Sequence, residues 1–259
     1  MRGLSGCVQA EGCGSEIGLV VTLKIDGREV NAKEGQTILE TARANGIEIP
    51  SLCHNDAIEP YGACRLCLVE ITTPSGRKRL VTSCLYPVEE GLTVETASDR
   101  VITNRRTLAE LLLARSPNEK VVQDIARKVG VDTVPFRPEY VEDNSCILCA
   151  QCVRACQEVV GVSAISLANR GINREVAPPF LETATACIGC GSCVYICPTQ
   201  CIKMEDVGDT RKIHNWKVEF KLKQCKVCGN YFAPEKQLEY IRSKLNLPQD
   251  FFDTCPNCK

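Results

Sequence analysis

Two copies of one cysteine pattern constrain this chain more than any other feature of its sequence. Each copy reads C-x2-C-x2-C-x3-C, and a proline, Pro198, follows the second copy directly. The eight cysteines are Cys146, Cys149, Cys152 and Cys156 in the first run and Cys187, Cys190, Cys193 and Cys197 in the second. In iron-sulfur runs of this spacing, three thiolates hold one cluster and the fourth reaches its neighbour. The duplication therefore predicts two 4Fe-4S clusters in one module.

The same rule predicts which cysteines share a cluster, because the two runs exchange their fourth members. The first cluster is expected on Cys146, Cys149, Cys152 and Cys197, and the second on Cys187, Cys190, Cys193 and Cys156. Disulfides or simple packing would have to produce the duplicated spacing by chance. Cys201, four residues after the second run, is predicted to be a buried thiol near a cluster, because the eight positions already complete both cubes.

A third cysteine group lies earlier in the chain and has the spacing C-x10-C-x2-C-x16-C. Its members are Cys53, Cys64, Cys67 and Cys84. Four thiolates suit a 2Fe-2S cluster. The neighbouring His54 is predicted to shield this cluster and not to bind it, since the Rieske arrangement needs two histidines and His214 does not fit the pattern.

The segment around this group reads as strands, turns and one helix. Strands are expected at 19–25 and 29–31, joined by the turn Asp26-Gly27, and later at 66–72 and 80–83. A helix is expected over 37–45, with Gly46 after its end. This order resembles the β-grasp fold of plant-type ferredoxins, although the gap of ten residues is longer than the plant spacing.

Residues 98–130 are predicted to form two helices that pack the ferredoxin parts together. The first has its apolar residues at Val101, Leu108, Leu111 and Leu112, and the second at Val121, Ile125 and Val129. The tetrapeptide 116–119, Ser-Pro-Asn-Glu, has the form of a capping box with proline at the first helical position. Exposed apolar residues on these helices would indicate a partner surface.

Four more cysteines near the C-terminus form two knuckles, Cys225-x2-Cys228 and Cys255-x2-Cys258, around a predicted helix at 235–245. Such pairs favour one zinc ion in a closed thiolate shell, which stabilises a segment too small for its own core. A single iron in a rubredoxin-like site or an additional iron-sulfur cluster remains compatible with the same spacing.

Composition and absent motifs narrow the class of protein further. The 19 cysteines are grouped at ligand spacings, which favours a reducing, cytoplasmic compartment over a secreted disulfide scaffold. The sequence shows no signal peptide and no apolar run of membrane-spanning length. A net charge of -1 gives no indication of a basic surface that would bind nucleic acid. No Rossmann or P-loop motif is present, so the chain is not expected to bind a nucleotide by itself.

Over residues 19–206 the order of parts resembles the diaphorase iron-sulfur subunit of soluble NAD-linked hydrogenases, formate dehydrogenases and flavin-based electron-bifurcating complexes, which is related to the large iron-sulfur subunit of complex I. The segments that carry the resemblance are 61–67, 111–117, 143–160, 169–171 and 187–198. Some relatives have a further cluster held by one histidine and three cysteines between these parts. This chain has no cysteine between Cys84 and Cys146, so that cluster is not expected here.

The resemblance implies a non-catalytic electron-relay subunit of an oxidoreductase complex. Its expected partners are an NAD(P)-binding flavoprotein and a catalytic hydrogenase, formate dehydrogenase or second flavin subunit, in a hetero-oligomer without nucleic acid or a membrane span. The alternative is a free-standing polyferredoxin that carries electrons or binds regulatory partners.

The expected fold class is α+β, divided into five parts. They are an N-terminal tail (1–18, with Cys7 and Cys13), a 2Fe-2S β-grasp ferredoxin domain (19–98), a helical linker (99–140), a two-cluster 4Fe-4S ferredoxin domain (141–208) and a small C-terminal metal ribbon with four cysteines (213–259).

Overall fold

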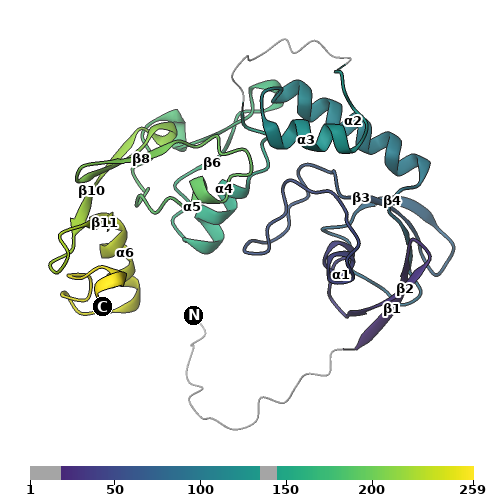
Figure 1. Ribbon diagram of the computed structural model, residues 1–259, viewed down its shortest axis with the longest axis horizontal. Helices are drawn as coiled ribbons and strands as arrows, with labels where there is room; N and C mark the ends of the chain where they lie inside the picture. Colours follow the sequence, from purple (N-terminus) through teal and green to yellow (C-terminus); the bar gives the residue numbers. More distant parts are fainter. Residues whose placement is uncertain (1–18, 135–144) are drawn as a thin grey trace, which may run out of the picture.

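The computed structural model describes residues 19–134 and 145–259. The predicted N-terminal tail with Cys7 and Cys13, the last residues of the predicted linker, and Asp143 lie outside the described residues. The chain is a mixed helix and sheet structure that extends along one axis, with β1 near one end and α6 near the other (Figure 1).

The first part is a five-stranded sheet in the order β2-β1-β5-β3-β4. Its strands are β1 (Val20–Ile25), β2 (Arg28–Lys33), β3 (Leu68–Thr72), β4 (Lys78–Thr82) and β5 (Thr93–Glu95). All neighbouring pairs are antiparallel except β1 and β5, which run parallel. Buried aliphatic side chains such as Leu23, Val69 and Val94 fill the core beneath the sheet.

Helix α1 (Ile38–Ala44) packs on this core through Ile38 and Leu39. It begins at Thr37, whose side chain accepts a hydrogen bond from the Glu40 amide at 3.2 Å, while the Glu40 carboxylate accepts one from the Thr37 amide at 2.7 Å. This reciprocal capping fixes the start of the helix. The predicted helix, the hairpin at Asp26-Gly27 and the two later strands are confirmed within one or two residues.

The second part is a pair of helices, α2 (Asp99–Arg115) and α3 (Lys120–Lys128), which lie side by side in Figure 1. The predicted capping box at 116–119 is wrong. The Ser116 amide donates to Leu112 O at 2.9 Å and so closes α2, while Pro117 and Asn118 form the turn and Glu119 becomes the N-cap of α3. The Ser116 hydroxyl is buried and has no hydrogen-bond partner within the described chain, so it does not cap α3.

The two cysteine runs lie in the central part, which contains only short elements. These are α4 (Gln151–Arg154), the π-helical turn η1 (Ala155–Val159), β6 (Ser166–Ala168), η2 (Gly171–Asn173), β7 (Glu175–Ala177), η3 (Pro179–Leu181) and α5 (Ser192–Tyr195). Strands β6 and β7 pair with each other. Most of the polypeptide here is loop, so cysteine ligation would be needed to organise it.

A four-stranded antiparallel sheet in the order β11-β10-β9-β8 completes the chain. Its elements are β8 (Met204–Val207), β9 (Thr210–Ile213), η4 (His214–Trp216), β10 (Val218–Gln224), β11 (Tyr231–Pro234), the predicted helix α6 (Glu235–Leu245) and η5 (Pro256–Cys258). The boundary expected between 208 and 213 falls inside this sheet. The C-terminal module is thus continuous with the cysteine-run part through β8 and β9.

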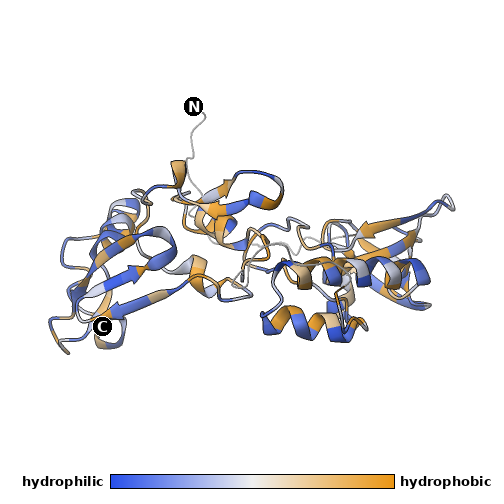
Figure 2. Cartoon of the chain, turned by 90° about the horizontal axis from the view of Figure 1, so that it is seen from above, coloured by the Kyte–Doolittle hydropathy of each residue, from blue (hydrophilic) through white to orange (hydrophobic). Residues whose placement is uncertain are grey.

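The longer helices carry both hydrophilic and hydrophobic residues in Figure 2. In the described ranges 19–134 and 145–259, no helix has the length and apolar character that a bilayer crossing requires.

Candidate functional site

The cysteines of the first group lie in two loops of the five-stranded part. Cys53, Cys64 and Cys67 lie between α1 and β3, and Cys84 lies just after β4; all four are buried. A hydrogen bond from Cys64 lowers the pKa of Cys53 to about 6. A hydrogen bond from Cys84 likewise lowers the pKa of Cys67 to about 6. The thiols therefore stand as two close pairs, an arrangement that suits a centre with two irons.

The backbone of this loop turns its amides toward sulfur. The Cys64 amide donates to Cys53 Sγ at 3.3 Å, and the Leu52 amide donates to Cys64 Sγ at 3.5 Å. Gly62 permits the turn because its φ is +69° and because a Cβ there would lie 2.6 Å from Leu85 Cδ1. Amide donors of this kind stabilise negative charge on thiolate sulfur.

The second cysteine run lies around one enclosed cavity with an apolar lining. The four thiols on this cavity are those of Cys156, Cys187, Cys190 and Cys193, accompanied by residues such as Ile165 and Ile188. Three of them come from the second run and one, Cys156, from the first. This is the set that sequence spacing predicts for one cube.

A second group of thiols in the central part contains Cys146, Cys149, Cys152 and Cys197. Burial and, to a smaller extent, the nearby Cys197 and Cys146 thiolates raise the pKa of Cys149 to about 11, although the Gln151 amide opposes them. Cys152 is also buried, and its charge interactions are with Cys149, Cys146, Cys193 and Cys197. Cys197 thus lies among the first three cysteines of the other run.

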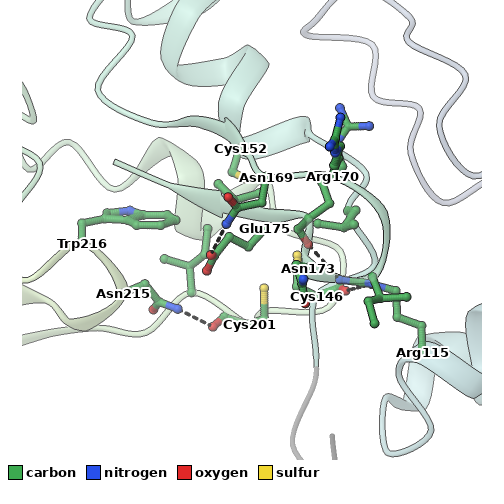
Figure 3. A pocket seen from close by; sticks show the side chains of 15 residues that line it. Arg115, Cys146, Cys152, Asn169, Arg170, Asn173, Glu175, Cys201, Asn215 and Trp216 are labelled. Carbon is green, nitrogen blue, oxygen red and sulfur yellow. Dashed lines mark hydrogen bonds between the residues drawn. The ribbon is translucent and has the colours of Figure 1, made fainter. Parts of the chain in front are cut away.

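Cys201 lies beside this second group of thiols, as expected, but it is half-buried and not fully buried. Its sulfur is 3.5 Å from Cys197 Sγ, and its hydrogen bonds lower the pKa of Cys197 to about 5 and of Cys146 to about 6. Cys146, Cys152 and Cys201 line one open hollow of about 1040 Å³, together with Arg115 and Arg170. Figure 3 shows these side chains.

Two buried arginines indicate that anionic groups belong in these sites. The Arg154 side chain is 8% exposed, and within the described chain neither its Nε nor its Nη1 has a hydrogen-bond partner. Its Nη2 donates to Cys53 O at 3.3 Å, and the guanidinium lies 5.6 Å from the Tyr61 ring centroid. Arg105 is also buried and donates to Leu66 O and Leu68 O.

Among the described residues neither arginine forms a carboxylate ion pair. An unpaired buried cation is costly, and metal-bound thiolates would supply the missing negative charge. The residues present therefore fit iron-sulfur clusters.

Direct contacts join the first cysteine group to the first run. Gln151 Nε2 donates to Leu52 O at 2.9 Å, and the Glu59 amide donates to Glu158 Oε2 at 2.9 Å. One apolar cluster contains residues from both sites and from the helix pair: Leu52, Cys53, Cys64, Leu66, Val122, Ile147 and Cys149, with Leu108, Leu112 and Ile125 at its edge. Both helices thus contribute apolar side chains to the cluster that contains Cys53, Cys64 and Cys149.

The C-terminal thiols of Cys225, Cys228, Cys255 and Cys258 all lie within 4.8 Å of one another. Within this set, Cys228 Sγ and Cys255 Sγ are 3.8 Å apart. The amides of Cys228 and Cys255 lower the pKa of Cys225 to about 6, which favours the thiolate that a metal needs.

Neither histidine belongs to a group of thiols. The His54 side chain is buried, and its Nε2 lies 3.0 Å from Asp56 Oδ1. His214 lies near Glu205 at the surface. Sequence reasoning missed Arg154, Arg105 and Trp216. Arg154 lies inside the first cysteine run, so its position there was a signal in the sequence, but its contact with the Cys53 loop depends on the fold. Arg105 and Trp216 belong to no cysteine motif, and their proximity to sulfur depends on how distant segments pack.

Two family models match the chain. A 2Fe-2S iron-sulfur cluster binding domain matches residues 19–99, and a 4Fe-4S dicluster domain matches residues 140–204. The first match contains the first cysteine group, and the second contains both cysteine runs and Cys201. The four cysteines of the C-terminal module lie outside both.

Several curated proteins are similar to this chain. The NADP-reducing hydrogenase subunit HndD of Solidesulfovibrio fructosivorans is 35% identical over 209 residues, which are 70% of this chain and 35% of that protein. The NADPH-Fe(3+) oxidoreductase subunit alpha of Geobacter sulfurreducens is 33% identical over 202 residues, 70% of this chain and 24% of that protein. An NADH-quinone oxidoreductase subunit of Rhizobium meliloti is 31% identical over 203 residues, 69% of this chain and 23% of that protein.

The chain thus spans about a third or less of the length of these curated relatives. A solved structure, the H2-reduced state of an NAD+-reducing [NiFe]-hydrogenase, contains a chain that matches with 31% identity and a TM-score of 0.55. That match covers 61% of this chain and 75% of the other.

Proposed function

Because the chain belongs to the family of iron-sulfur subunits shared by NAD(P)-linked hydrogenases and NADH-quinone oxidoreductases, we propose that it relays electrons within a flavin-containing, NAD(P)-linked complex. Its partners in this proposal are an NAD(P)-binding flavoprotein and a catalytic subunit of hydrogenase, formate dehydrogenase or electron-bifurcating type. The chain itself is non-catalytic, and the complex works in the reducing cytoplasm.

The observation that carries this proposal is the direct packing of the first cysteine group against the first run. The Gln151 and Arg154 side chains of α4 donate to the backbone of Leu52 and Cys53. These contacts leave no room for a domain between the two sites, which agrees with the lack of cysteine between Cys84 and Cys146. Bound clusters would supply centres that accept and release one electron each. The chain contributes the short separation, the burial and the positive charge between them.

The ligand sets in this proposal follow the thiol groupings. A 2Fe-2S cluster is held by Cys53, Cys64, Cys67 and Cys84 in a β-grasp domain, which the five-stranded sheet and α1 support. The first 4Fe-4S cluster is held by Cys146, Cys149, Cys152 and Cys197. The second is held by Cys187, Cys190, Cys193 and Cys156, whose common cavity supports this set.

The C-terminal module holds one zinc ion in this proposal. Zinc–sulfur bonds of about 2.3 Å keep tetrahedral thiolates about 3.8 Å apart. The separation of 3.8 Å between Cys228 and Cys255, and the compactness of the whole set, agree with that value. A 4Fe-4S cube binds each thiolate on a different iron and would spread the four sulfurs farther apart, so the geometry favours a single ion.

Two apolar side chains of α2, Ile102 and Leu111, are exposed. They are nine residues apart and lie on opposite faces of the helix, so they do not form one continuous patch. The preference for membership in a complex over a free-standing polyferredoxin therefore rests on the relatives, which are subunits of oxidoreductases and hydrogenases.

Anaerobic purification of the native protein under gentle conditions tests the proposal. Mass spectrometry is expected to find a flavoprotein and a catalytic subunit, and the preparation is expected to reduce a dye with NAD(P)H. Metal analysis is expected to give about ten iron atoms and about one zinc per chain. Elution of the chain alone, with intact clusters and no NAD(P)H activity, would support a free-standing carrier. About fourteen iron atoms per chain without zinc would show that the C-terminal module binds a third 4Fe-4S cluster.

A further inference from the structure

The single tryptophan of the chain lies at the second cysteine run, although it comes from a different segment. Trp216 ends the short turn η4 between β9 and β10, twelve residues after the end of the segment that matches the dicluster domain. It is 4% exposed and packs in one core with Cys152, Cys193 and Ile213. Its carbonyl accepts a hydrogen bond from the Ala184 amide at 3.3 Å, which holds the turn against the loop that leads to Cys187.

The indole of Trp216 donates a hydrogen bond to a cysteine. Its Nε1 lies 3.4 Å from Cys193 Sγ, within the range of a hydrogen bond to sulfur. The ring lines the cavity that contains Cys156, Cys187, Cys190 and Cys193. It also lines the open hollow with Cys152 on the other side, as Figure 3 shows. Trp216 thus lies between the two groups of thiols but donates to a member of only one.

The matched cysteine of the first run has a different environment. Cys152 is the third cysteine of its run, as Cys193 is of the second, and both are buried. In the part of the chain that the structure describes, no side-chain donor is found at Cys152, whose pKa burial raises. Burial also raises the pKa of Cys193, but there the indole N–H opposes the effect. The two runs therefore differ at equivalent positions by one buried N–H donor.

We propose that Trp216 is a positioning residue that raises the reduction potential of the second 4Fe-4S cluster through its hydrogen bond to Cys193. This inference rests on the proposed ligand sets. Reduction adds negative charge, part of which resides on the ligand sulfur, and a donor aimed at that sulfur stabilises the reduced state. The C-terminal module would thereby give the two 4Fe-4S clusters different reduction potentials, although their cysteine spacing is identical.

Replacement of the indole N–H alone tests the proposal. Because Trp216 is the only tryptophan, growth with β-(3-benzothienyl)alanine in place of tryptophan changes this one position of the chain, substituting sulfur for the N–H with little change in shape. The potentials are measured by EPR-monitored redox titration of the full protein. The second cube is identified as the signal that disappears in Cys156→Ala.

In the analogue-containing protein we expect all cluster signals to persist and the second cube to become harder to reduce. The expected shift is about tenfold in the reduction equilibrium, or about 59 mV for a one-electron couple. The 2Fe-2S cluster and the first cube are expected to keep their potentials. Trp216→Phe is expected to shift the second cube in the same direction, which separates the loss of the donor from any effect of the analogue's sulfur.

Other outcomes overturn the inference in distinguishable ways. Unchanged potentials with intact clusters would show that the hydrogen bond does not set the potential. Loss of the second cube in both variants would show that Trp216 builds the site instead of tuning it. Absence of that cube from the unmodified protein would contradict the proposed ligand sets themselves.

Discussion

The two cysteine runs share their spacing and their left-handed backbone turns, yet they lie against different parts of the molecule. In the first run Leu148 and Ala150 have φ of +54° and +60°, and in the second Gly189 and Gly191, at the same positions, have φ of +75° and +76°. The same left-handed turns therefore present both sets of thiols. Only the second run has glycine at these positions, where other residues incur strain.

The difference lies in what surrounds each run. The first packs on the 2Fe-2S loop, where the buried Arg154 lies over Tyr61 and donates to Cys53 O. The second packs on the C-terminal module, which contributes Trp216 and Phe220. Two runs with the same spacing can therefore differ in charge and hydrogen bonding, through a variable position inside the motif such as Arg154 and through residues outside it such as Trp216.

The largest expected effect tests whether the runs exchange their fourth cysteines. Cys156→Ala is expected to remove one cube, lowering the iron content from about ten to about six atoms per chain. The lost EPR signal should be the one also lost in Cys190→Ala, because both thiols line the same cavity. Cys197→Ala is the matched variant and should lose the signal that Cys149→Ala loses. If Cys156→Ala instead loses the signal that Cys149→Ala loses, each run binds its own cluster.

An intermediate effect is expected from the buried guanidinium of Arg154, which lies within the first run and has no carboxylate partner among the described residues. Arg154→Gln is expected to lower the potentials of the 2Fe-2S cluster and the first cube by on the order of 50 mV, since a nearby buried charge contributes about 1 to 4 kcal/mol at an effective dielectric constant of about 20. Redox titration followed by EPR measures the shift.

The control for this variant is Tyr195→Gln, which changes the matched position of the second run. Tyr195 is 78% exposed, so its replacement is expected to leave all three potentials in place. An equal shift of all clusters in Arg154→Gln would contradict a local role for the guanidinium.

The smallest expected effect concerns the attachment of the C-terminal module to the second run. Gly189→Ala places a Cβ 2.6 Å from Phe220 Cδ2 and 3.0 Å from Pro234 Cγ at a backbone φ of +75°. We expect local destabilisation of about 1 to 3 kcal/mol, which lowers the hydrogen-exchange protection of β10 and β11 by about tenfold per 1.4 kcal/mol. Leu148→Gly, at the matched position, should leave that protection unchanged. Equal hydrogen-exchange protection of β10 and β11 in both variants would show that Gly189 is not required for the contact between the second run and the C-terminal module.

Much of the local structure was predictable because it depends on short-range patterns. The Thr37-to-Asn45 helix, the Asp26-Gly27 turn and the helix at 235–245 match the structure closely. The capping box at 116–119 failed because α2 extends to Arg115 and uses Ser116 as its C-cap. Local sequence offers two uses for such a serine, and packing of the helix pair against both ferredoxin parts selects one.

The number and kind of the cysteine groups could be read from the amino-acid sequence, since ligand spacing is a local property of the chain. The side chains that surround the sulfurs depend on the fold. Arg154 lies between two sites because α4 packs on the loop of Cys53, and Trp216 reaches Cys193 because β9 and β10 fold the C-terminal extension back onto the second run. Hydrogen bonding and charge act over a few ångströms in space, so residues distant in the chain set the surroundings of each site.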